Sequence, residues 1–105
     1  MAKYILSILA RKLMIIKSWG FKDPMALSND EGLIFQVNGF KHKGYVLVAY
    51  DKPSDLFDIT LLNDDKNELQ IIEDVFVGEI IDVIDNAVEY TSDYKERVKK
   101  EYQIN

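Results

Sequence analysis

The chain has 105 residues, of which 48% are hydrophobic and 30% are charged, and its net charge at pH 7 is −5. This composition excludes a disordered chain, and the length suits a single domain over residues 1–105. The absence of cysteine excludes a disulfide framework and a zinc site with thiolate ligands, and it fits a reducing compartment. We therefore expect a cytoplasmic protein.

The apolar run near the N-terminus is too short to span a membrane, and basic side chains interrupt it. Residues 4–10 are mostly apolar, but Arg11 and Lys12 end the run. A signal peptide needs an uninterrupted apolar region with a cleavage site of small residues, and a membrane span needs about 18 apolar residues. The sequence therefore predicts neither an export signal nor a membrane span.

Charge is segregated along the chain. Residues 1–22 hold five basic side chains and no acidic one, whereas residues 51–93 hold thirteen acidic side chains against Lys52 and Lys66. A net acidic protein binds nucleic acid poorly, because it cannot release counterions from the phosphates, so we do not expect a nucleic-acid partner. The basic side chains Lys3, Arg11, Lys12 and Lys17 either complement the acidic body of the same chain or contact lipid headgroups, nucleic acid or an acidic partner, and a peripheral amphipathic anchor is a further alternative.

The first predicted element is a helix over residues 2–18. Its inward stripe is Ile5, Leu9, Leu13 and Ile16. Gly20 is a predicted C-cap, and the segment 21–32, with Pro24, is expected to be a loop. The helix is also apolar outside that stripe, so it is either deeply buried or shared with a second chain, and a homodimer through this helix is a hypothesis.

Four strands are predicted next, at residues 33–40, 45–51, 56–62 and 68–73, forming an antiparallel meander with one apolar face. The dipeptide Asn38-Gly39 favours a two-residue turn, but apolar pairing favours a turn at residues 41–44. That register pairs Phe40 with Tyr45, Val37 with Val48 and Phe35 with Tyr50. The connection between the second and third predicted strands should place Phe57, Ile59 and Leu61 opposite Tyr50, Val48 and Val46. Leu69 and Ile71 of the fourth predicted strand are expected on the same apolar face.

An amphipathic helix is predicted over residues 76–90. Asp93 and Glu96 have capping-box spacing, so the C-terminal part is either one long kinked helix or a kinked pair. The predicted fold class is therefore α+β, with an N-terminal helix, a four-stranded antiparallel meander, and one or two C-terminal helices packed on one face of the sheet.

Three groups of residues are candidate contact sites. Lys41, His42 and Lys43 at a predicted loop tip form a weak candidate for anion contact, with a solvated turn as the alternative. Trp19, Phe21 and Met25 form a candidate apolar interface, with a small core at the end of the sheet as the alternative. The candidate acidic surface is a carboxylate row on the last helices, with the solvated face of an amphipathic helix as the alternative, and it consists of Asp82, Asp85, Glu89, Asp93 and Glu96.

No pattern in the chain supports catalysis, a cofactor or a metal. There is one histidine and no phosphate-binding glycine loop. The spacing of Asn63, Asp65, Asn67 and Asp74 is similar to that of a calcium loop, but Glu68 stands where the sharp turn needs glycine.

The function that we predict is that of a small non-enzymatic protein-interaction module, whose acidic surface binds a basic protein partner. One alternative is a nucleic-acid mimic that inhibits a DNA- or RNA-binding protein. A second alternative is a nucleic-acid binder that uses the N-terminal helix and the Lys41–Lys43 loop.

Overall fold

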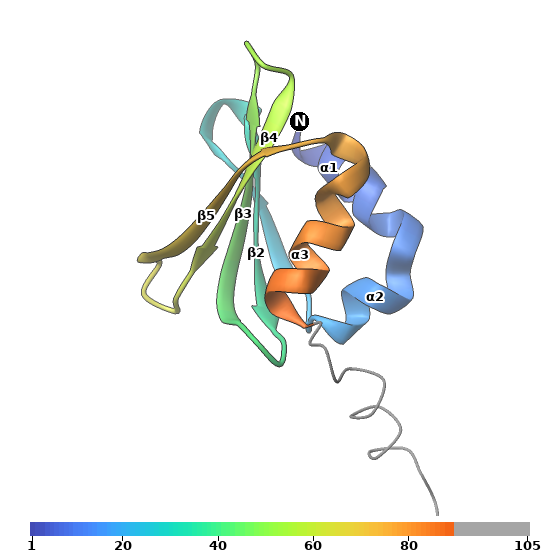
Figure 1. The fold of residues 1–105 in the computed structure, drawn as a ribbon, viewed down its shortest axis with the longest axis vertical. Helices are drawn as coiled ribbons and strands as arrows, with labels where there is room; N and C mark the ends of the chain where they lie inside the picture. Colours follow the sequence, from blue (N-terminus) through green and yellow to red (C-terminus); the bar gives the residue numbers. More distant parts are fainter. Residues whose placement is uncertain (90–105) are drawn as a thin grey trace, which may run out of the picture.

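The computed structural model describes residues 1–89 and has an α+β fold with one antiparallel sheet in the strand order β1-β2-β3-β4-β5. Figure 1 shows the three α-helices on one side of this sheet. The strands are β1 (Lys22–Ala26), β2 (Gly32–Asn38), β3 (Lys43–Asp51), β4 (Leu56–Leu62) and β5 (Glu68–Val75). The helices are α1 (Ala2–Leu9), α2 (Leu13–Ser18) and α3 (Ile80–Val88), with 3₁₀ turns η1 (Ala10–Lys12), η2 (Ser28–Asp30) and η3 (Val77–Glu79).

The sheet has five strands where four were predicted, because β1 lies in the segment expected to be a loop. Its partner is β2, with Met25 opposite Ile34 and Lys22 opposite Gln36. The strand contains Pro24, which is tolerated because β1 is an edge strand. Asp23 has a positive φ of 53°, and the register shifts between Lys22 and Met25, so the strand is bulged at this point.

The predicted pairing of β3 with β4 is confirmed, whereas that of β2 with β3 is wrong. Val48 lies opposite Ile59 as expected. In the other hairpin Val37 lies opposite Gly44 rather than Val48, and Asn38 and Lys43 form the last pair. The inward face of each strand is nevertheless the predicted one, because the shift is an even number of residues.

The face predicted for β5 is also wrong at its start. Leu69 is 60% exposed and Ile71 is 48% exposed, with Ile71 opposite Thr60 on the open face, by which we mean the face away from the helices. Ile72 and Val75 point inward instead, opposite Ile59 and Phe57. Two register shifts in the pairing with β4 insert extra residues, and each bulge reverses the alternation of side chains.

The predicted helix over residues 2–18 is broken in the structure. The turn η1 separates α1 from α2, and Lys12 leaves the helical region with φ −131° and ψ 57°. Leu13, predicted to be inward, is therefore 59% exposed, and Met14 is 82% exposed. The predicted helix over 76–90 is confirmed as η3 followed by α3, while its continuation past residue 89 lies outside the described residues.

The core lies between the helices and the inner face of the sheet. Ile5 of α1, Phe35 and Val48 of the sheet, and Ile80 and Ile84 of α3 are all fully buried. Within residues 1–89, no helix is long and apolar enough to cross a bilayer.

Candidate interaction surfaces

The loop between β2 and β3 binds the C-terminal end of α3. The backbone N–H of Lys41 donates to the carbonyl oxygen of Val88 at 2.8 Å, and that of Phe40 donates to Oε2 of Glu89 at 2.9 Å. The Lys41 ammonium donates to the carbonyl oxygen of Asn86. Cations and N–H donors stabilise a helix C-terminus because they satisfy its last carbonyls and oppose its dipole, so this loop is a structural cap.

The structure does not bring the three candidate anion contacts together. Lys41 lies on the end of α3, and His42 is 7% exposed, with its Nε2 3.1 Å from the carbonyl oxygen of Tyr45. Lys43 is exposed and pairs with Asn38 at the end of the hairpin. The buried imidazole is therefore part of the hairpin rather than the tip of a solvated loop.

The predicted carboxylate row is divided between surface and interior. Asp82 is exposed, but Asp85 accepts a hydrogen bond of 2.9 Å from Nε1 of Trp19, and Glu89 is 6% exposed. Asp93 and Glu96 lie outside the described residues. Because two of the three described carboxylates bind the protein itself, the row is not one continuous solvent-facing surface.

A larger group of exposed carboxylates surrounds β5 instead. We call it the acidic edge; its members are Asp64, Asp65, Glu68, Glu73, Asp74, Glu79 and Asp82, all exposed. Lys66 is the one basic residue within this stretch, and its ammonium lies over the ring of Tyr45, 5.2 Å from the centroid. The acidic block visible in the sequence is therefore gathered along one side of the sheet and the start of α3.

The acidic edge coincides with an unpaired strand edge. In the described part of the chain β5 pairs only with β4, so one side of its backbone has no neighbouring strand. Its pairing with β4 is regular from Gln70 to Ile72. An edge strand of this kind can accept an added strand, while its charged side chains and bulges discourage unspecific pairing with other edges.

A row of side chains that are apolar except for Thr60 crosses the open face next to this edge. In register from β1 to β5, the row is Met25, Ile34, Leu47, Thr60 and Ile71. Within residues 1–89 no helix lies on this face (Figure 1). The side chains at the two ends of the row, Met25 and Ile71, are 62% and 48% exposed. Sequence reasoning missed this row because it assigned β1 to a loop and Ile71 to the core.

Two of the three candidate apolar interface residues belong to the core. Trp19 is fully buried and stacks on Phe35, with ring centroids 6.5 Å apart, and Phe21 lies 4.7 Å from the same ring. Met25 alone is exposed, at the β1 end of the row on the open face.

Within residues 1–89, two side chains have a shifted pKa, the carboxyl group of Asp30 and the hydroxyl group of Tyr50, and both lie away from these surfaces. The pKa of Asp30 is lowered, first by its hydrogen bond with the N-terminal ammonium and then by the N–H of Ala2. The pKa of Tyr50 is raised, chiefly by the hydrogen bond that it donates to Asp55. Both contacts hold a turn or a chain end in place.

Within the described residues there is no group of three or more histidine or acidic side chains placed to hold a metal ion. The chain matches no protein-family model, and no similar protein is found among curated sequences or solved structures.

Proposed function

We propose that the chain is a small non-enzymatic interaction module whose acidic edge binds a basic, extended segment of a protein partner. The observation that carries this proposal is the coincidence of an unpaired strand edge with the exposed carboxylates around it. An added strand gains backbone hydrogen bonds, and its lysine or arginine side chains gain favourable contacts with Glu68 and Glu73.

The same geometry favours a peptide over nucleic-acid mimicry. A mimic needs a continuous array of carboxylates, and Asp85 and Glu89 are occupied by contacts inside the protein. Exposed Leu69 and Ile71 at the strand edge have no counterpart on a phosphate backbone, whereas alternate apolar side chains of a bound strand would pack on them.

A peptide of alternating lysine and valine is a direct probe. We expect it to bind and to protect backbone amides of β5 from hydrogen exchange, whereas a peptide with glutamate in place of lysine should not bind. The double variant Glu68→Gln, Glu73→Gln should weaken binding and flatten its salt dependence, because the two charges no longer contribute.

The variant Ile71→Ser separates the apolar contribution, since it should weaken binding equally at all salt concentrations. Glu31→Gln is the matched control, because Glu31 is an exposed acid at the β1–β2 connection, remote from β5. An equal loss of peptide affinity in the Glu31→Gln control would contradict the proposal. Peptide binding that leaves the β5 amides unprotected from hydrogen exchange would contradict it too.

A further inference from the structure

The bend in the N-terminal helix lacks an ordinary local cause. Residues 10–12 contain neither glycine nor proline, which are the usual origins of a sharp break. A continuous helix would place Leu13 on the same stripe as the buried Leu9 and Ile16. Instead residues 10–14 are exposed in succession, with Leu13 and Met14 in solvent. Places where a chain departs from its own local pattern are typical of functional surfaces.

Basic side chains adjoin these two exposed apolar residues, since Arg11 and Lys12 directly precede them and Lys17 follows in α2. Lys3 lies farther away, at the start of α1, and all four basic side chains are exposed. Among residues 1–89, the ion pair between the N-terminal ammonium and Asp30 is the only one within 4.0 Å, so none of the four contacts a carboxylate of the described chain. Their charge is therefore available to a ligand outside the protein.

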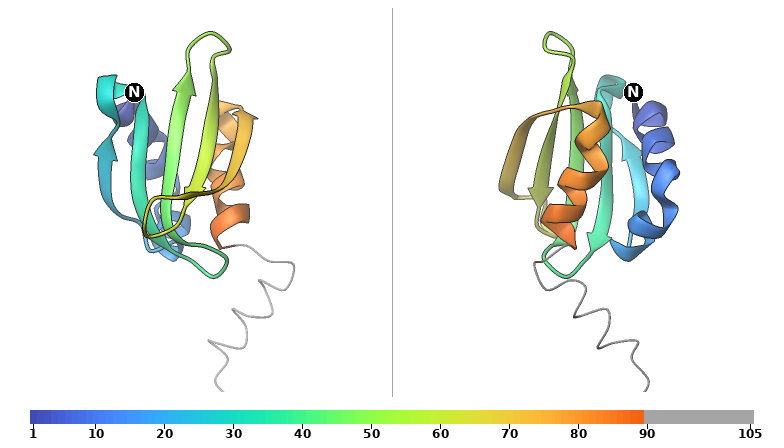
Figure 2. Two further views of the ribbon diagram at one scale, coloured as in Figure 1. Left: turned by 90° about the vertical axis from the view of Figure 1, so that its left-hand side faces the viewer. Right: turned by 45° about the vertical axis from the view of Figure 1, so that its right-hand side comes forward.

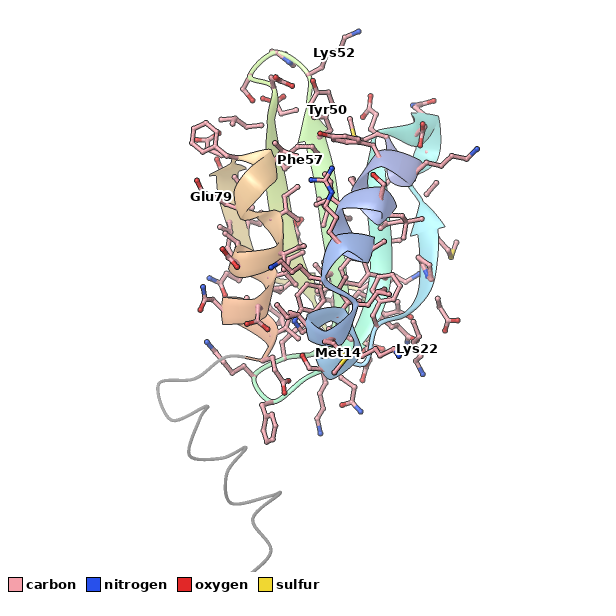
Figure 3. All side chains as sticks on the ribbon, turned by 90° about the vertical axis from the view of Figure 1, so that its right-hand side faces the viewer. Met14, Lys22, Tyr50, Lys52, Phe57 and Glu79 are labelled. Carbon is pink, nitrogen blue, oxygen red and sulfur yellow. The ribbon has the colours of Figure 1, made fainter. Side chains whose placement is uncertain are left out.

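A groove opens beside the bend, between α1 and the η3–α3 segment. Its volume is about 250 Å³, and its lining includes the apolar Ile8, Val77 and Ile81 together with Arg11 and Lys12. The nearest acidic residue of η3, Glu79, lies on the side of α3 away from α1 (Figure 3). The groove thus combines an apolar floor with a cationic rim, which fits a ligand that joins an acyl chain to an anionic headgroup.

We propose that this surface, made of the bend at residues 10–14 and the adjoining groove, docks on an anionic lipid bilayer. Leu13 and Met14 enter the interface between headgroups and acyl chains, while Arg11 and Lys12 contact lipid phosphates. Interfacial binding of this type depends on apolar insertion and on attraction between basic side chains and anionic lipids together.

Other occupants fit the surface less well. A nucleic acid would use the cations but would leave Leu13 and Met14 in water. A second copy of the chain, related by a two-fold axis at this helix, would place the Arg11 and Lys12 side chains of both copies against each other, which costs energy in an isologous contact. A bilayer satisfies both the apolar and the cationic groups.

The net charge of −5 does not prevent this docking, because the charges are segregated. Figure 2 shows α1 and β5 on opposite sides of the molecule. The carboxylates that β5 carries therefore point away from a bilayer that faces the helix side, and salt screens their repulsion over this distance. Glu79 and Asp82 are nearer, because they are chain neighbours of the groove residues Gly78 and Ile81.

The test is sedimentation of the full-length protein with vesicles. We expect binding to phosphatidylcholine vesicles that contain phosphatidylglycerol, and none to vesicles of phosphatidylcholine alone. Each basic residue near an anionic surface contributes a factor of about five to partitioning. The double variant Arg11→Gln, Lys12→Gln should therefore lower the partition coefficient roughly 25-fold, and Met14→Ser should lower it severalfold.

The matched control is Lys52→Gln, an exposed lysine in the β3–β4 turn, which should bind vesicles as the unchanged protein does. All four positions are exposed, so circular dichroism should show the same fold in each variant. The proposal is overturned by absence of vesicle binding at low salt, or by equal binding of the Arg11→Gln, Lys12→Gln variant. It is also overturned if Met14→Ser binds unchanged while duplex DNA competes, since the surface would then recognise polyanions rather than lipid.

Discussion

Replacing Gly39 by alanine should disrupt the contact between the β2–β3 loop and the end of α3. A Cβ atom at this position would lie 2.4 Å from the carbonyl oxygen of Val88 and 2.5 Å from its Cγ1. Val88 is fully buried, so neither atom can move away without disturbing the core. Gly39 is therefore needed for close approach, and not for the tight turn that Asn38-Gly39 first indicates.

The loss of stability in Gly39→Ala follows from the two ways in which the protein can respond to the added Cβ atom. Separation of the loop from α3 would lose the hydrogen bond from Lys41 to Val88 and the one from Phe40 to the Glu89 carboxylate. Their net values are about 1 kcal/mol and about 1.5–3 kcal/mol. Retention of the contact would strain the packing, at a cost of about 1–3 kcal/mol. The protein takes the less costly response, so we expect a loss of about 1–3 kcal/mol in the free energy of unfolding.

Urea unfolding followed by Trp19 fluorescence measures this loss, since Trp19 is the only tryptophan and is fully buried. The midpoint should fall while the slope stays constant. Gly78→Ala is the matched control, because a Cβ at Gly78 meets no atom within 4 Å, and a gain of about 0.4–1 kcal/mol is expected. A Gly39→Ala protein within about 0.5 kcal/mol of the unchanged protein would refute the steric reasoning.

Three further changes test other parts of the structure. Trp19→Phe removes the N–H that donates to Asp85 and should cost about 1–3 kcal/mol by thermal unfolding; an unchanged melting temperature would exclude that bond. Phe35→Ala empties the fully buried centre of the aromatic cluster and should cost about 3–5 kcal/mol by the same measurement, and a loss below 1 kcal/mol would contradict the packing. Because the folded pKa of Asp30 is lowered, its contribution to stability is complete above its unfolded pKa and is lost as pH falls through the lower folded value. Thermal unfolding of Asp30→Asn should therefore lack this acid-dependent component, and identical pH profiles would show that the contact is absent in solution.

The sequence predicted those strand pairs that side-chain alternation alone determines. On β4, apolar residues alternate with polar ones from Phe57 to Leu61, and the short connection to β3 fixes which residues of the two strands meet. Val46, Val48, Ile59 and Leu61 consequently lie where the pattern places them. The fold class followed from the same alternation combined with helical periodicity at the two ends of the chain.

The strand pairings that were predicted wrongly depend on contacts between residues distant in sequence. The β2–β3 loop is held by the carbonyls of α3, so local turn chemistry and apolar matching both gave the wrong register. On β5, Asp74 has a φ of 58° and its N–H donates to the Asp58 side chain, a bulge that no residue type in the strand announces. Exposed Leu13 and Met14 follow from a helix break that likewise has no glycine or proline as a signal.

The candidate surfaces were predictable in charge but not in shape. Sequence alone revealed an acidic block and a basic N-terminus, since both are runs of like charge. It did not reveal which carboxylates the protein uses internally, because Asp85 and Glu89 resemble Asp82 in every local respect. Only the positions of Trp19 and Phe40 distinguish them.

The separation of charge across the sheet has a physical consequence of its own. A surface selected for solubility alone intersperses the two signs, and short-range ion pairs then form between them. Here the bend at residues 10–14 carries basic side chains and β5 carries carboxylates, and within residues 1–89 no ion pair connects the two. Because α1 and β5 lie on opposite sides of the molecule (Figure 2), a change at Glu73 of β5 and a change at Arg11 should not affect each other. Arg11→Gln should therefore leave binding of the basic peptide unchanged, and Glu73→Gln should leave vesicle binding unchanged. Loss of both activities in either variant would show one shared surface, and the two proposals would then have to be replaced by a single one.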